Sequence, residues 1–339
     1  MAIEYLYGIY TSRNTYQLND SISSLSQGLI SQAIALCSPF FQIEAYRWVF
    51  TQTHTLSAPT FWQTAWGWVL GFVIYDFFDY WLHRTSHVSA IFWSSHVVHH
   101  QSQRFNLSTG LRQESFYPII GFVFFIPMAL MGINPEQYAV TAIGILIYQF
   151  WIHTEHIGKL GWFDKIFSSP SNHRVHHAIN EQYLDKNFGA MLIIWDRLFG
   201  TFKEETTACI YGTRNALNSW NPIYALFAVL MDLLQKIRKA SSLSQRLGYL
   251  FKPPGWSPPK NTAPSFPMND DITPASLYNP PYRRGGPIGA MTVFLLSAIL
   301  TGLYVTEAET WLGVNQYLGL ALIGLLFYWV GYLMEKPIR

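Results

Sequence analysis

Histidine is the residue whose spacing in this sequence suggests chemistry. Ten of the eleven histidines lie in four short clusters: HRTSH at 83–87, HVVHH at 96–100, HTEH at 153–156 and HRVHH at 173–177. On a helix, positions i, i+3 and i+4 share a face, so each cluster can direct two or three imidazole rings toward one place. Imidazole is a common ligand of iron, zinc, copper and nickel. The spacing therefore predicts metal binding.

A structural role is the alternative for any single histidine, and we interpret His54, which stands apart from the clusters, in that way. This interpretation fails for the other ten, because buried polar groups need partners and ten rings would need many. A shared metal centre satisfies them together. One ion rarely takes more than about six ligands and a catalytic ion keeps a position open, so nine or ten imidazoles predict two ions. Two iron ions would suit the activation of O2, but zinc fits the same ligands.

The composition predicts that these clusters are positioned by membrane helices. Hydrophobic residues make up 50% of the 339 residues and charged residues only 12%, about half the usual share. The net charge of +2 and the lack of a basic block give no reason to expect a nucleic-acid partner. Runs long enough to cross a bilayer occur at 61–82, 116–133, 137–156, 288–306 and 311–334, and a weaker one at 28–50 is interrupted by Glu44 and Arg47. We expect an all-α integral membrane protein with about six transmembrane or membrane-embedded helices.

The positions of Lys and Arg predict the orientation of these helices. The short connections 51–60, 134–136 and 307–310 contain neither residue, whereas the opposite connections contain many. Because positive residues favour the cytoplasmic side, the histidine clusters are expected to face the cytoplasm. The membrane would be a bacterial inner membrane or the endoplasmic reticulum. We see no cleaved signal peptide at the start of the sequence.

We divide the chain into four parts on the same grounds. Residues 1–60 form an N-terminal membrane-associated segment, and residues 61–204 form a catalytic domain that contains the histidine clusters. Residues 205–287 combine an amphipathic stretch at 220–235, expected at the membrane surface, with a proline-rich covering loop at 252–287. Residues 288–339 form a C-terminal pair of transmembrane helices.

The clusters HRTSH, HVVHH and HRVHH, in this order and separated by a pair of hydrophobic crossings, resemble those of the fatty acid hydroxylase and sterol desaturase superfamily. Within it, the chain is most similar to the alkylglycerol monooxygenase branch in the stretches HHQSQRFNLSTGLRQ (99–113), YQFWIHTE (148–155), DKNFGAMLIIWDRLFGTF (185–202) and FKPPGWSPP (251–259). The resemblance implies a membrane-bound non-haem di-iron oxygenase. Such an enzyme uses O2 and tetrahydropterin to hydroxylate the carbon beside the ether oxygen of an alkyl glycerol. The resulting hemiacetal breaks down to an aldehyde and glycerol.

The resemblance also implies a set of site residues. The expected metal ligands are His83, His87, His96, His99, His100, His153, His173, His176 and His177, with His156 as a possible addition. Glu155 would bind iron or hold His153. Catalytic roles are also expected for Asn187 and Asp196. Six polar residues close to the clusters are candidates either for hydrogen bonds to the imidazoles or for ordinary hydrogen bonds within loops: Asn106, Arg112, Asn180, Asp185, Asn187 and Asp196. Two positions depart from the family pattern: His156 replaces an apolar residue and Asn172 replaces a histidine. The chain also begins later than its larger relatives, so a leading helix is expected to be missing.

Several functions remain open at this stage. The same fold serves fatty acyl, sterol and ornithine-lipid hydroxylases or desaturases, because a fold does not determine its substrate. A zinc-dependent hydrolase of membrane lipids would use similar ligands without O2. A metal transporter would place its ligands near the middle of the membrane rather than at one end of the helices. An oxygenase would act on a membrane lipid and, since no haem or flavin motif is present, would need a separate electron donor, either a pterin or a redox protein.

Overall fold

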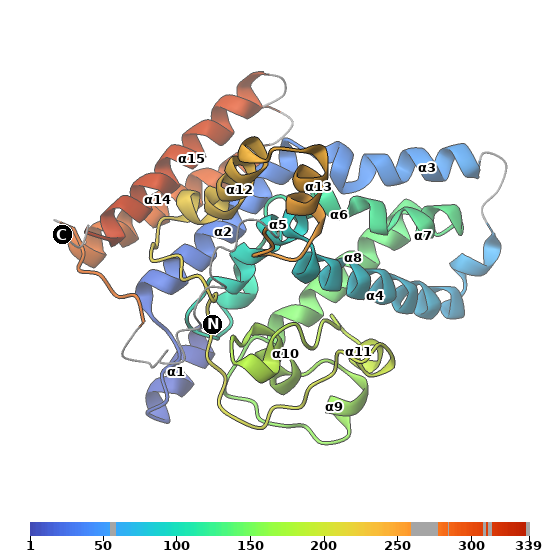
Figure 1. Cartoon of the computed structure of the whole chain (residues 1–339), viewed down its shortest axis with the longest axis horizontal. Coiled ribbons are helices and arrows are strands. Elements are labelled where there is room, and N and C mark those ends of the chain that lie inside the picture. Colours follow the sequence, from blue (N-terminus) through green and yellow to red (C-terminus); the bar gives the residue numbers. More distant parts are fainter. Residues whose placement is uncertain (55–58, 259–276, 284, 308–309, 311–313, 337–339) are drawn as a thin grey trace.

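The computed structural model describes residues 1–54, 59–258, 277–283, 285–307, 310 and 314–336, and over these ranges the chain is helical, with no β-strand. Two isolated antiparallel bridges, Phe167 with Leu192 and Ala178 with Tyr211, join extended segments in the same ranges. The predicted all-α class is therefore confirmed. Figure 1 shows the longer helices in the upper part of the view, with α1 (Ala2–Tyr10), α9 (Phe163–Ile166), α10 (Pro170–His177) and α11 (Ile194–Leu198) below them.

Two consecutive helices, α4 (Ala65–Val88) and α5 (Ala90–His100), form the frame for the first two histidine clusters. α4 begins at an N-cap, where the Thr64 hydroxyl accepts a hydrogen bond from the Gly67 backbone N–H at 3.1 Å. It ends at Ser89, whose extended backbone separates the two helices. The predicted span 61–82 lies mostly in a helix that continues beyond the apolar run and carries HRTSH on its last turns.

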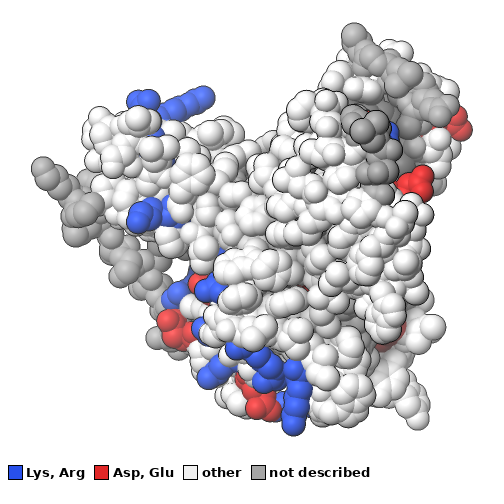
Figure 2. Space-filling view, turned by 90° about the vertical axis from the view of Figure 1, so that its right-hand side faces the viewer, with Lys and Arg blue, Asp and Glu red and all other residues white. Residues whose placement is uncertain are grey.

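The last two predicted spans form the helix pair α14 (Gly286–Thr306) and α15 (Val314–Met334), which pack against each other and against α2 (Leu18–Leu36). Among the described helices, these two are long and apolar enough to cross a membrane. Their outer side chains, Leu295, Ile299, Leu303, Leu318 and Leu325, are more than half exposed. Figure 2 likewise shows wide areas of one face of the molecule without a charged side chain. Such a surface is expected of helices that lie in lipid.

The predicted span 116–133 is wrong as a single helix. The chain there forms α6 (Tyr117–Gly121), a 3₁₀ turn at Phe122–Phe124 and α7 (Ile126–Leu130). Pro118 lies in the first turn of α6. Pro127 lies in the first turn of α7, because proline has no backbone N–H to continue the hydrogen-bond ladder of the preceding turn.

Two other stretches form shorter helices than predicted. The stretch 28–50 is divided into the end of α2, a π-helical turn at Phe40–Glu44 and α3 (Ala45–Thr53). The stretch 137–156 forms α8 (Pro135–Trp151), which ends before His153. A count of six crossings therefore stays a prediction.

The amphipathic stretch predicted at 220–235 forms α12 (Pro222–Lys239), which is followed by α13 (Leu243–Phe251). One side of α12 buries Leu226 and Leu233, while Phe227 and Met231 on the other side are exposed. The buried side packs with α2, α5 and α15. Its position at a membrane surface stays a prediction. Half of the predicted proline-rich loop, residues 259–276, lies outside the described residues.

Candidate metal centre

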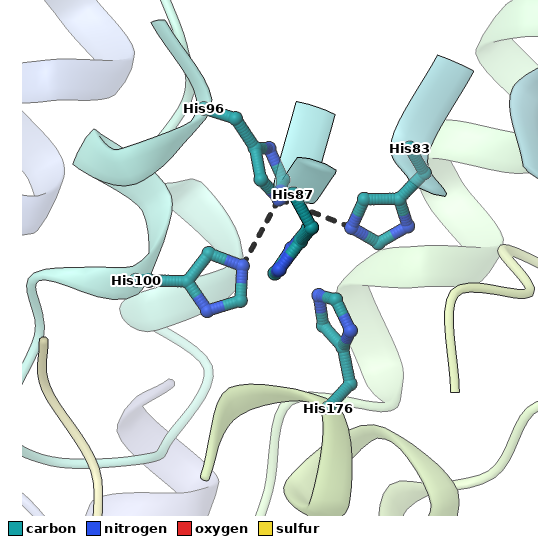
Figure 3. A group of neighbouring side chains, drawn as sticks. All are labelled: His83, His87, His96, His100 and His176. Carbon is teal, nitrogen blue, oxygen red and sulfur yellow. Dashed lines mark hydrogen bonds between the residues drawn. The ribbon is translucent and has the colours of Figure 1, made fainter. Parts of the chain in front are cut away.

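Nine buried histidines lie together in the middle of the molecule and form two groups. The five-histidine group contains His83, His87, His96, His100 and His176, and the four-histidine group contains His99, His153, His173 and His177. In each group, one ring nitrogen from every residue lies within 4.8 Å of all the others. Figure 3 shows the five rings of the first group pointing toward a common centre. These are the nine histidines that the sequence singles out, and the structure brings all of them together.

The helical repeat determines which ring enters which group. His96 and His100 on α5 are four residues apart and enter the five-histidine group, while His99 between them enters the four-histidine group. On α10 the assignment is the opposite. His173 and His177, four residues apart, enter the four-histidine group, and His176 between them enters the five-histidine group. Adjacent residues on a helix point about 100° apart. Each HxxHH cluster thus directs two rings to one group, as expected, and its third ring to the other group.

The outer nitrogens of the rings show which nitrogen carries the proton. The Nδ1 atoms of six rings face acceptors. Four acceptors are backbone carbonyls: that of Phe188 for His83, of Arg112 for His99, of Gln149 for His153 and of Lys186 for His176. The other two are carboxylates, that of Glu114 for His96 and that of Asp185 for His87. A carbonyl oxygen only accepts, so a neutral ring bonded to one carries its proton on Nδ1. Its Nε2 atom is then left with a lone pair.

The inner nitrogens of the rings lie close together in both groups. The Nε2 atom of His96 lies 3.1 Å from that of His83 and 3.0 Å from that of His100. The Nε2 atom of His153 lies 3.2 Å from that of His99 and 2.9 Å from that of His173. In the pairs His83–His96 and His99–His153 both rings direct Nδ1 at an acceptor, so two Nε2 lone pairs face each other and cannot form a hydrogen bond, whereas a cation between them binds each one. The Nε2 atoms of His87 and His176 are also buried without a hydrogen-bond partner. The donor set therefore fits metal ions in both groups.

Burial favours the protonation state that metal binding requires. It lowers the pKa of His99 to about 4, and burial together with the neighbouring imidazoles lowers the pKa values of His100 and His177 well below their usual range. These rings are therefore neutral at pH 7. Neutral imidazole is the form that coordinates a metal.

Glu155 and His156 lie outside both groups. The Glu155 carboxylate is a quarter exposed and lies 3.9 Å from the Arg13 guanidinium. The His156 ring packs edge-on against Tyr7, with ring centres 5.2 Å apart, and its buried Nε2 has no hydrogen-bond partner. Asn172, which stands where the family pattern has a histidine, donates its side-chain amide to the carbonyls of Asp164 and Phe167. Catalytic or ligand roles for Glu155 and His156 stay predictions.

Asn187 and Asp196 hold the loop at 185–203 in place rather than contacting the rings. Asn187 donates its side-chain amide to the carbonyls of Asn172 and Lys203. Asp196 is fully buried and accepts hydrogen bonds from the backbone N–H groups of Phe188 and Gly189. This loop supplies the carbonyls that accept from His83 and His176. Both residues therefore act on the histidines through the backbone.

The other candidates divide into two kinds. Arg112 and Asp185 accept hydrogen bonds from imidazoles, as predicted, although Arg112 does so with its backbone carbonyl. Asn106 bonds to Thr15 and Ser108, and Asn180 bonds to Ala208 and Ile210, so both stabilise loops.

Sequence reasoning missed Asp76 and Glu114. Fully buried Asp76 accepts hydrogen bonds from the backbone N–H groups of Met191 and Leu192 and from the indole of Trp195, which joins α4 to the loop at 185–203. Both carboxylates lie inside or beside long apolar runs. An acid in such a context was the available signal, because burial of a charge requires specific partners.

The contacts of Asp196 lead to a test. In Asp196→Asn, an amide N–H must face a backbone N–H, which leaves a buried donor unsatisfied at a cost of about 1–3 kcal/mol. We expect a lower melting temperature and a metal affinity about tenfold to hundredfold weaker, because the carbonyls behind His83 and His176 shift. Metal content after dialysis and thermal melting would measure both effects. Glu181→Gln, which alters an exposed ion pair with Arg214, is the control; equal metal affinity in the two variants would contradict this role for Asp196.

Comparisons with known proteins agree with this geometry. Residues 68–201 match the family model for fatty acid hydroxylase. The chain is 39% identical to an alkylglycerol monooxygenase of Danio rerio over 72% of the chain and 54% of that protein, and 36% identical to one of Homo sapiens over 76% and 56%. It is 35% identical to the ornithine lipid hydroxylase OlsE of Rhizobium tropici over 44% of the chain and 45% of that protein. The chain thus spans little more than half the length of the two alkylglycerol monooxygenases, and no solved structure matches it.

Proposed function

We propose that this member of the fatty acid hydroxylase family is an O2-dependent lipid monooxygenase that holds two iron ions, one in each histidine group. The observation that carries this proposal is the arrangement of nine buried imidazoles in two groups, six of which direct Nδ1 at an outer acceptor. Iron held there would supply the activation of O2 that hydroxylation of a C–H bond requires. The nine rings would be the ligands.

The rest of the chain would position the metal ligands and exclude water. Backbone carbonyls of Phe188, Arg112, Gln149 and Lys186 fix the orientation of four rings by accepting from Nδ1. Phe105, which is fully buried, covers one side of the four-histidine group, with its ring centre 5.2 Å from that of His177. A centre enclosed in this way keeps its oxidising chemistry away from bulk water.

The proposed substrate is an O-alkyl glycerol. Hydroxylation of the carbon beside the ether oxygen would give a hemiacetal that breaks down to an aldehyde and glycerol. Support comes from four relatives named alkylglycerol monooxygenase, which are 32–39% identical to the chain. We propose tetrahydropterin as the electron donor. The protein would cross the membrane several times, with its metal centre facing the cytoplasm.

The test uses the full chain, purified with iron in a mild detergent. Incubation with a 1-O-alkyl glycerol, O2 and tetrahydropterin is expected to release a fatty aldehyde, and the aldehyde is expected to carry label from ¹⁸O2. A 1-O-acyl glycerol of equal chain length is the control and should give no aldehyde. Absence of aldehyde from the ether would contradict the proposed substrate.

A second candidate is an ornithine-lipid hydroxylase, which the similarity to OlsE favours. It would show itself as O2-dependent hydroxylation of ornithine lipid by the same preparation. Release of fatty acid from an ester lipid without O2 by a zinc-loaded protein would instead favour a hydrolase.

A further inference from the structure

One ring of the metal centre has a buried carboxylate as its partner. The Nδ1 atom of His96 lies 2.6 Å from Oε1 of Glu114, and both side chains are almost fully buried, with 3% and 13% of their surfaces exposed. Glu114 lies between the 3₁₀ turn at Thr109–Leu111 and α6. It makes no ion pair with a lysine or arginine among the described residues. Burial raises the pKa of the Glu114 carboxyl to about 8, and a cation held by His96 would favour its charged form.

His96 is well placed to transmit the influence of the Glu114 carboxylate to the other ligands of the five-histidine group. Its Nε2 atom lies within 3.1 Å of the Nε2 atoms of both His83 and His100, so it stands between two other ligands. A carboxylate that accepts from Nδ1 fixes the plane of the ring and makes Nε2 a stronger donor to a metal. The carboxylate charge also attracts a cation directly, and the attraction is strong where water is excluded.

The four-histidine group has no comparable partner. The Nδ1 atoms of His99 and His153 donate to backbone carbonyls, and the buried Nδ1 atom of His173 has no hydrogen-bond partner. The second carboxylate at the centre, Asp185, also faces the five-histidine group through His87, but its side chain is 60% exposed and the distance is 3.3 Å. Solvent screens a charge in that position. Over the described part of the chain, a buried carboxylate thus contacts a ring of the five-histidine group and none contacts a ring of the four-histidine group.

We propose that Glu114 makes the five-histidine group the tighter of the two metal sites. This inference rests on the two-metal centre proposed above, and it assigns Glu114 as a positioning residue that acts through His96. The two sites would then load in sequence, the five-histidine group first.

The experiment is a titration of the chelator-treated full chain with Fe²⁺ under anaerobic conditions, in competition with a chromophoric chelator. The wild type is expected to show a tight and a weak site. Glu114→Gln keeps the size and an acceptor oxygen but removes the charge, and it should weaken the tight site about tenfold to hundredfold. Asp185→Asn is the matched control, because it makes the same change at an exposed carboxylate, and should weaken binding about fivefold or less.

Two adjacent residues identify which site is which. His176→Ala should remove the tight site, and His177→Ala should remove the weak one, because these neighbours on α10 enter different groups. Mössbauer spectra of ⁵⁷Fe-loaded protein should show one of two iron signals altered in Glu114→Gln. Unchanged melting of the metal-free variant would show that it folds.

The outcomes separate the inference from the proposal on which it rests. A wild type that does not bind two ions would overturn both. Two ions in the wild type with unchanged affinities in Glu114→Gln would overturn the inference alone. Loss of the tight site in His177→Ala would also overturn it, since the four-histidine group would then be the tighter one.

Discussion

Replacement of His99 by alanine is expected to abolish lipid oxidation and to remove about one iron per chain while leaving the protein folded. The Nε2 atom of His99 lies 3.2 Å from that of His153, so the four-histidine group would keep only three rings. The five-histidine group would keep all its ligands. Since the metal sites are expected to act as a unit, turnover should fall about a thousandfold or more. Iron content by mass spectrometry and aldehyde release from an alkyl glycerol are the measurements.

His54→Ala is the control for this experiment. His54 lies outside both groups, where its ring stacks on Phe50 and its Nδ1 is 2.8 Å from the Thr53 hydroxyl. Iron content and turnover should match those of the wild type. Full turnover in His99→Ala would contradict the proposed centre.

Arg112→Met is expected to cause the largest loss of stability. The Arg112 side chain is 1% exposed and donates hydrogen bonds to the carbonyl of Val98, the amide oxygen of Gln101 and the hydroxyl of Ser23. It therefore ties α2 to α5. Burial lowers the pKa of Arg112 to about 10, so it is still a cation at pH 7 and balances the buried carboxylate of Asp20. Removal of one member of such a network costs about 3–5 kcal/mol.

The measurement is the apparent melting temperature in detergent, together with the iron content. Methionine preserves much of the side-chain volume, so the effect reports mainly the lost charge and hydrogen bonds. Asp20→Asn in the Arg112→Met background removes the unbalanced charge and should recover part of the loss. Equal melting temperatures of Arg112→Met and the wild type would show that the network contributes little.

The ligand set could be predicted from the sequence because it depends on local geometry. Histidines three and four residues apart on a helix lie on one side whatever the rest of the fold does. Division of the rings between two groups could not be predicted, because it depends on how α5 and α10 face each other. Glu114 was missed for the same reason, since it is separated from His96 in sequence and meets it through the turn that follows α5.

The helices were predicted well where the sequence is uniformly apolar and less well elsewhere. The stretch 288–306 lies in α14 as expected. At 116–133 the average apolar character was high, but Pro127 interrupts the backbone hydrogen bonds before α7. Hydrophobic length alone thus does not show where the backbone hydrogen bonds are interrupted.

The division of α5 and α10 between the two groups also has a consequence for biogenesis. The five-histidine group draws His83, His87, His96 and His100 from two consecutive helices. Four ligands for one ion are therefore present in a nascent chain as soon as residue 100 has left the ribosome. The other group has only His99 at that moment and is completed last, by α10. An ion captured early would fasten α4 to α5 and give the later segments a template on which to assemble.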